Sequence, residues 1–279
     1  MPYSIIKTFN SPNEFLEWAT KAPTPWRGKL SSREFRSDDW AGTSNFDQAY
    51  QLAKYGWEDG LKRLQKYMDI AELIIPVQKT KVWHYSAAGY YPNSGRASAG
   101  DPFNMAAPRR EELKQKPIIP IRTNISANAD VSSDRIMQWG AAICSYVNAL
   151  EASGFSVELE TVSDTYGGSD APKISFQFPI KKAGESLSLI STVFWWAHPA
   201  ALRRIEFSAM ERLDIEQWYN PGYGKAGTWT KASAGTLDLS IRDACYTIEE
   251  SIYAIRKKHQ DMLDNTKRAD VNLPRLDRV

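Results

Sequence analysis

The most regular hydrophobic pattern of the chain lies between residues 118 and 263. The apolar run at 118–123 is typical of a buried strand, and apolar residues that recur every three or four positions predict a helix over 132–152. The segments 155–161 and 174–178 alternate around the turn Tyr166-Gly167-Gly168, which predicts an antiparallel hairpin. The pattern then predicts two helices, a short strand and a long helix, at 187–193, 199–213, 237–239 and 241–263.

This order of elements predicts an α/β domain over 118–263. Strand-helix-strand units favour right-handed crossovers and a mainly parallel sheet with helices on both of its faces. The hairpin adds one antiparallel strand, which we expect at an edge of the sheet. The charged residues 264–279 are expected to form a loose tail.

Residues 1–76 are predicted to form an N-terminal helical region. Apolar residues follow helical spacing on both sides of Gly56, so we expect a helical hairpin over about 44–75. The hairpin is superficially similar to a helix-turn-helix, but Glu58 and Asp59 would face phosphate at the start of the recognition helix. An ordinary helical hairpin is therefore the favoured interpretation.

The segment 77–117 combines aromatic residues with turn formers. Five aromatics stand close together here, and the chain then runs through Gly100-Asp101-Pro102 into the charged residues 109–116. Flexible linkers seldom carry so many aromatics, and long loops within compact chains tend to have a function. We therefore expect a long ordered loop with a binding role.

Composition and charge exclude several classes of protein for this chain. The chain has 279 residues, 42% of them apolar, and a formal net charge of +2, so no strong overall field attracts nucleic acid or anionic lipid. Its two cysteines do not make a disulfide framework, and no apolar run reaches the roughly 20 residues of a membrane helix. The N-terminus has no signal-peptide pattern, so we expect a soluble cytoplasmic protein that does not bind membranes.

Residues 118–263 resemble a von Willebrand factor A-type domain. In that family the loop after the first strand carries the metal motif Asp-x-Ser-x-Ser, and the corresponding residues here are Asn124-Ile125-Ser126-Ala127-Asn128. The middle Ser matches, whereas Asn124 replaces the Asp and Asn128 replaces the last Ser. A hard divalent cation needs the lost carboxylate, so no metal is expected at this degenerate motif.

The whole chain resembles an uncharacterised family encoded by bacteriophages. Three stretches carry the resemblance: Trp40-Ala41-Gly42-Thr43-Ser44 with Gly56-Trp57, Gly100-Asp101-Pro102, and 198–204, which begins with His198-Pro199. The resemblance implies a phage-type protein in the cytoplasm of the host cell, and it implies no known activity.

Local motifs for catalysis or cofactor binding are missing from the sequence. The three histidines have no metal-ligand spacing to one another or to cysteine, and neither a Walker-type phosphate loop nor a Gly-x-Ser-x-Gly elbow occurs. We therefore predict no catalytic residue, metal or cofactor. Carboxylates could still come together in the fold, so an enzyme remains a third hypothesis.

The candidate binding residues lie in two aromatic loops. Tyr90, Tyr91 and Arg96 stand beside turn formers that should reach solvent, and His84 lies nearby in the sequence. A Gly-rich loop with Tyr223 and Trp229 is the second candidate. Aromatic residues and arginine dominate hot spots in protein interfaces, so we expect a non-enzymatic interaction protein with a protein partner and an open oligomeric state. The alternative is a nucleic-acid-binding accessory protein that stacks single strands on these aromatics beside Arg96, with Arg109 and Arg110 nearby.

Overall fold

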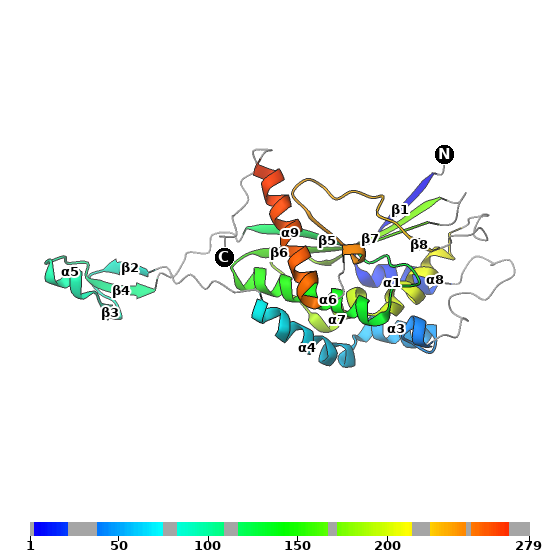
Figure 1. The fold of residues 1–279 in the computed structure, drawn as a ribbon, viewed down its shortest axis with the longest axis horizontal. Helices are drawn as coiled ribbons and strands as arrows, with labels where there is room; N and C mark the ends of the chain where they lie inside the picture. Colours follow the sequence, from blue (N-terminus) through cyan, green and yellow to red (C-terminus); the bar gives the residue numbers. More distant parts are fainter. Residues whose placement is uncertain are drawn as a thin grey trace.

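A computed structural model describes residues 3–21, 38–74, 83–108, 117–166, 172–213, 224–243 and 247–267. Figure 1 shows a larger sheet with helices packed against it and, apart from it, a small three-stranded unit formed by residues 83–108. The strands of the larger sheet are β1 (Ser4–Thr8), β5 (Ile118–Asn124), β6 (Ser156–Tyr166), β7 (Lys173–Lys181), β8 (Lys225–Ala226) and β9 (Leu237–Ser240).

The larger sheet has the strand order β1-β7-β6-β5-β9, with the two-residue β8 paired to the end of β6. β5 pairs in parallel with β6 and β9, and β1 pairs in parallel with β7, whereas β6 and β7 are antiparallel. The predicted α/β class with a mainly parallel sheet is confirmed. The antiparallel β7 was expected at an edge, but the parallel β1 covers it there.

Helices cover one face of this sheet (Figure 1). They are α1 (Pro12–Thr20), α6 (Ser133–Ala152), α7 (Leu189–Ala197) and, at the β9 side, α9 (Ile248–Lys267). Phe178 of β7 stacks on Phe15 of α1 at 4.8 Å and meets Trp195 of α7 edge-on at 5.2 Å, between ring centroids. The opposite face, where a second helical layer was expected, is covered over Asn124 and Asp164 by the loop that precedes β9.

The predicted helix over 132–152 is confirmed as α6, with Ser132 capping its start. Its predicted apolar side is buried: Ile136, Ile143, Val147 and Leu150. The predicted helix over 199–213 is instead a π-helix at Ala201–Glu206 followed by α8 (Phe207–Met210), and the C-terminal helix starts later than expected, after the short 3-10 turn Ile241–Asp243.

The N-terminal region contains α2 (Asp38–Ala41), α3 (Phe46–Tyr55) and α4 (Glu58–Ile74). α3 and α4 follow one another along the lower side of the body in Figure 1 rather than packing as the expected hairpin. Both helices use their apolar sides on other partners, α3 on α7 and the π-helix and α4 on α6, α7 and α9. The buried residues of this region and of the sheet therefore form one hydrophobic core.

Residues 83–108 form regular structure where a long loop was expected. β2 (Trp83–Ser86), β4 (Met105–Pro108) and β3 (Tyr91–Pro92) make an antiparallel sheet in the order β2-β4-β3, and the short helix α5 (Ser94–Ser98) follows β3. Gly89 lets the chain cross closely over β4, because a Cβ there would lie 2.7 Å from the Ala106 carbonyl oxygen. Strands of two to four residues leave little periodic signal in a sequence.

Candidate binding surface

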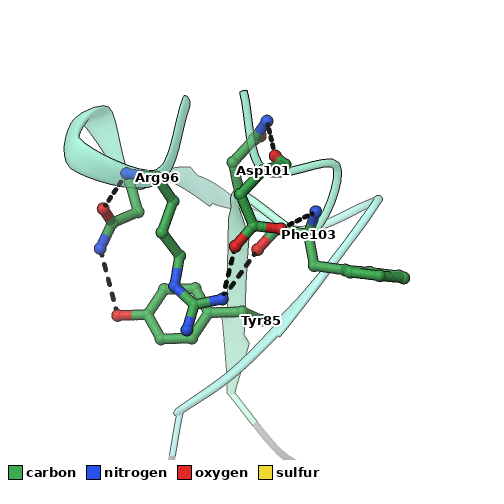
Figure 2. Close-up of polar contacts among 6 residues, drawn as sticks. Tyr85, Arg96, Asp101 and Phe103 are labelled. Carbon is green, nitrogen blue, oxygen red and sulfur yellow. Dashed lines mark hydrogen bonds and ion pairs between the residues drawn. The ribbon is translucent and has the colours of Figure 1, made fainter. Parts of the chain in front are cut away.

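A polar network organises the three-stranded unit around Arg96 (Figure 2). The guanidinium of Arg96 lies 4.1 Å from the centroid of the Tyr85 ring and donates from Nη1 to Asp101 Oδ2 at 3.0 Å. Asn93 caps α5 by accepting from the Arg96 amide, and its Nδ2 donates to the Tyr85 hydroxyl at 3.2 Å. Arg96 was predicted to bind a partner; the structure pairs its guanidinium with Asp101, and its binding role stays a prediction.

Asp101 completes this network from the other side. Its Oδ1 accepts from the Phe103 amide at 2.9 Å, and its carbonyl oxygen accepts from Asn104 Nδ2 at 2.9 Å. The ion pair with Arg96 is partly exposed to solvent, so it stabilises the unit by about 1 kcal/mol at most. Its main effect is to fix the turn that carries Phe103.

Among the described side chains of the unit, three aromatic ones are more than half exposed to solvent. Tyr90 is 79% exposed, Tyr91 62% and Phe103 55%, whereas aromatic rings usually lose most of their surface on folding. The backbone beneath them is ordered, because the Tyr90 amide donates to the Ala106 carbonyl at 3.0 Å. We refer to these three exposed side chains together as the aromatic surface: Tyr90, Tyr91 and Phe103.

The strand register places Tyr91 and Tyr85 on one face of the small sheet. Both residues pair with Ala106 of β4, from opposite sides, and directly paired residues of antiparallel strands point to the same face. Two interstrand spacings separate them, or roughly 10 Å. The small Ala106 side chain therefore lies between two tyrosines.

The unit carries no net charge. Arg96 and Asp101 are the only Lys, Arg, Asp or Glu residues in the sequence from 83 to 108, and they pair with each other. Within these residues the aromatic surface therefore lacks the track of cations that a nucleic-acid backbone requires. The side chain of His84, and Arg109 and Arg110, lie outside the described residues.

The second candidate loop lies over the larger sheet, away from this unit in Figure 1. Tyr223 is outside the described residues, and Trp229 is half-buried beside Gly227. The loop is fastened to the sheet by Asp164, whose buried carboxylate accepts from the Thr230 amide at 3.0 Å and from its hydroxyl at 2.8 Å. The structure therefore does not bring the two predicted loops together.

The residues of the degenerate metal motif hold this loop and its neighbours. Asn124 accepts from the Ser126 amide and donates to the Gly227 carbonyl, both at 3.0 Å. Ser126 Oγ is 3.1 Å from Ser163 Oγ, and Asn128 Oδ1 accepts from the Ala226 amide at 3.1 Å. Each polar side chain thus has a protein partner, and the described residues contain no group of three or more His, Cys, Asp or Glu that could hold a metal ion.

Two of the stretches that carry the phage-family resemblance meet in a buried joint. A Cβ on Gly42 would lie 2.8 Å from Pro199 Cγ, and the rings of Trp57 and His198 are 4.4 Å apart. Arg203 donates to the carbonyls of Trp40 (2.6 Å), Asn128 (3.3 Å) and Val131 (2.6 Å). His198 is 5% exposed, so this joint is structural.

Glu206, at the end of the π-helix, carries a fully buried carboxyl group that no sequence motif indicates. Burial raises the pKa of Glu206 to about 8; the nearby carboxylate of Asp164 adds to the shift, and the neighbouring hydroxyls of Ser163 and Thr165 oppose it. No local motif marks this residue in the sequence, because its burial against β6 depends on the three-dimensional packing.

None of the helices that the structure describes is long and apolar enough to span a membrane. The comparison with curated proteins found no match, and the comparison with solved structures found none either. A family model does match, and it covers residues 3–271, nearly the whole chain. The chain therefore belongs to the family described as Domain of unknown function (DUF7192).

Proposed function

We propose that this chain is a non-enzymatic interaction protein that binds a protein partner through the aromatic surface of its three-stranded unit. The observation that carries the proposal is the exposure of Tyr90, Tyr91 and Phe103 on an ordered, uncharged scaffold. Tyrosine and phenylalanine bury large areas on binding with few rotatable bonds to fix, which makes them effective anchors.

The order of the unit supports this function. Arg96, Asp101, Asn93 and Tyr85 hold the turns that carry the aromatic surface, so the surface need not be ordered when a partner arrives. Preorganisation lowers the entropic cost of association, which can reach roughly 0.5–1.5 kcal/mol for each immobilised side chain.

The alternative function is nucleic-acid binding by stacking of bases. The exposed rings would suit single strands, but a stacking site also needs cations that follow the backbone. The unit itself supplies none beyond Arg96, so the alternative depends on the flanking Arg109 and Arg110. The absence of net charge on residues 83–108 favours a protein partner.

The setting of this function is also a proposal. A phage-type accessory protein in the cytoplasm of the host cell is what the likeness of the three sequence stretches implies. The likeness of residues 118–263 to an A-type domain is supported by the strand-helix-strand order with an antiparallel third strand, β5-α6-β6-β7. In this proposal the larger domain is the scaffold and the aromatic surface is the contact.

A pull-down combined with site-specific photo-crosslinking tests the function. We expect the wild-type chain to retain a protein partner after nuclease treatment, and a photo-crosslinker at position 90 to form an adduct with it. The variant with Tyr90→Ala and Tyr91→Ala should lose the partner and keep its melting temperature within a few degrees, because exposed substitutions usually change stability by under roughly 0.5 kcal/mol.

A matched control uses tyrosines of similar exposure elsewhere. Tyr55 and Tyr253 are 69% and 71% exposed, so replacing both with Ala removes comparable apolar surface. The control variant should keep the partner. Equal loss of the partner in both double variants would show non-specific hydrophobic binding. Loss of the partner from the wild-type chain on nuclease treatment would favour the nucleic-acid alternative.

A further inference from the structure

A polar crevice opens at the carboxyl ends of the parallel strands β5 and β9. β5 and β9 are parallel neighbours, so the loops that follow them leave the sheet at the same edge. Ligands of open α/β sheets commonly bind outside the carboxyl ends of the strands. Here the crevice holds a cavity of about 200 Å³ between residues 126–131, the first turn of α6, Ala226 and residues 241–242.

The charged lining of the cavity is mostly positive. Arg135 comes from the first turn of α6 and Arg242 from the turn after β9, against the single carboxylate of Asp130. One N–H of Arg242 donates to the Ala226 carbonyl at 2.6 Å, which fixes this guanidinium at the wall. The two arginines therefore approach one cavity from different elements.

A third guanidinium reinforces this field from behind the wall. Arg203 is 3% exposed and donates to the carbonyls of Asn128 and Val131, in the loop that lines the cavity. The carboxylate of Asp130, in the same loop, favours the charged form of Arg203 and offsets part of the cost of burying this cation. An anion in the cavity would lower the remaining cost of burial.

We propose that this crevice binds the phosphoryl group of a small molecule. The planar fork of arginine matches phosphate oxygens, and charge-assisted hydrogen bonds of this kind are among the strongest in proteins. A volume of about 200 Å³ suits a small anion, since drug-sized ligands occupy roughly 300–1,000 Å³. A divalent cation fits poorly, because Asn124, Ser126 and Asn128 are bonded to protein groups.

An adjoining cavity would take the rest of an organic phosphate. It measures about 220 Å³, shares Arg242 with the crevice, and is also lined by Thr230, Asp238 and Lys258. Its lining has hydroxyl, carboxylate and ammonium groups, which suits a polar remainder such as a sugar. This proposal is independent of the aromatic surface, and either can fail alone.

Calorimetric titration of the full chain with inorganic phosphate tests the site. We expect saturable binding of one phosphate per chain, and no binding heat with chloride at equal ionic strength. Arg135→Gln and Arg242→Gln should each weaken binding by about tenfold or more, since each removes a charge-assisted contact. Arg256→Gln, on the exposed side of α9, should leave the affinity unchanged.

A second pair of variants, one charged and one neutral, keeps the test decisive if an arginine variant fails to fold. Val131 lines the cavity and is half-buried, so Val131→Asp and Val131→Asn change its shape alike. Only the Asp variant should abolish phosphate binding. The proposal is overturned by absence of saturable phosphate binding, by equal effects of Asp and Asn, by weakening in Arg256→Gln, or by binding of acetate in place of phosphate.

Discussion

Glu206 makes the stability of the fold depend on pH in the neutral range. Its pKa lies near 8 in the folded chain because of burial, against an ordinary value near 4.5, so the native state holds a proton that the unfolded chain releases. The stabilising contribution is complete below about pH 4.5 and is lost as the pH rises through 8. Arg203 and Arg204, also buried in the π-helix, donate to backbone carbonyls, Arg204 to that of Thr43.

We therefore predict that Glu206→Gln flattens the stability profile between about pH 5 and pH 8. The neutral amide occupies nearly the same volume and needs no proton, so the variant should exceed the wild type by roughly a few kcal/mol at pH 8.5. Urea unfolding midpoints between pH 5 and pH 8.5 measure this difference. Parallel profiles for the two proteins would contradict the buried protonated carboxyl.

His259 lowers the stability of the fold at acid pH, whereas Glu206 lowers it as the pH rises. Burial lowers its pKa to about 4, and its Nδ1 is hydrogen-bonded to the hydroxyl of Tyr146 on α6. A lowered pKa gives stability that is present above about pH 6.5, the ordinary value, and lost as the pH falls through 4. The contact fixes α9 against α6.

The corresponding variant is His259→Gln, which cannot gain a proton. We expect it to be less stable than the wild type at pH 7, by roughly 1–3 kcal/mol for the altered buried contact, but to lose less on acidification to pH 4.5. The same urea series, extended to acid pH, provides the measurement. An unchanged acid slope would show that other groups cause the acid sensitivity.

At the scale of elements, α6 and α7 approach closely at one glycine. A Cβ on Gly140 would lie 2.6 Å from Ala197 Cβ and 3.0 Å from the Trp196 carbonyl oxygen, which is closer than side chains allow. Alanine would normally stabilise an interior helical position by about 1 kcal/mol relative to glycine. Here the packing of two buried helices opposes that preference.

Gly140→Ala is accordingly predicted to destabilise the protein, by roughly 1–3 kcal/mol from overpacking. Adding Ala197→Gly to it should restore part of the loss, because the second change removes the atom that the new methyl group meets. Thermal and urea unfolding of the single and double variants test the contact. A stabilising single variant would show that the helices can move apart at little cost.

At the scale of the whole molecule, hydrophobic periodicity predicted single helices and strands but not the contacts between segments that are distant in the sequence. α6 and the strands around it follow clear patterns, so the α/β class could be predicted from residues 118–263. β1 could not, because five residues carry little signal and its partner β7 is far away in the sequence. The helical hairpin predicted over 44–75 was wrong for a similar reason: the packing partners of α3 and α4 are helices that are distant in the sequence.

The candidate site shows the same division between local and distant information. Turn formers next to Tyr90 and Tyr91 indicated exposure, and both side chains are exposed, although their binding role stays a prediction. The pairing of Arg96 with Asp101 depends on the folded turn, so the sequence left Arg96 available for a ligand. The crevice at β5 and β9 joins residues 126–135 to 226–242, which only the sheet order brings together.

The parallel pairing of β1 with β7 affects the order of events while the chain is being made. Lys7 lies opposite Phe176, and the difference of their positions, 176 − 7, is 169 residues. At roughly 5–20 residues per second, synthesis separates the two strands by about 10–30 s. β1 leaves the ribosome first and can pair with β7 only after β7 has been synthesised. The ring of Phe15 likewise has no contact with Phe178 until then. Until then the nascent chain exposes the pairing edge of β1 and the ring of Phe15 to other molecules in the cell.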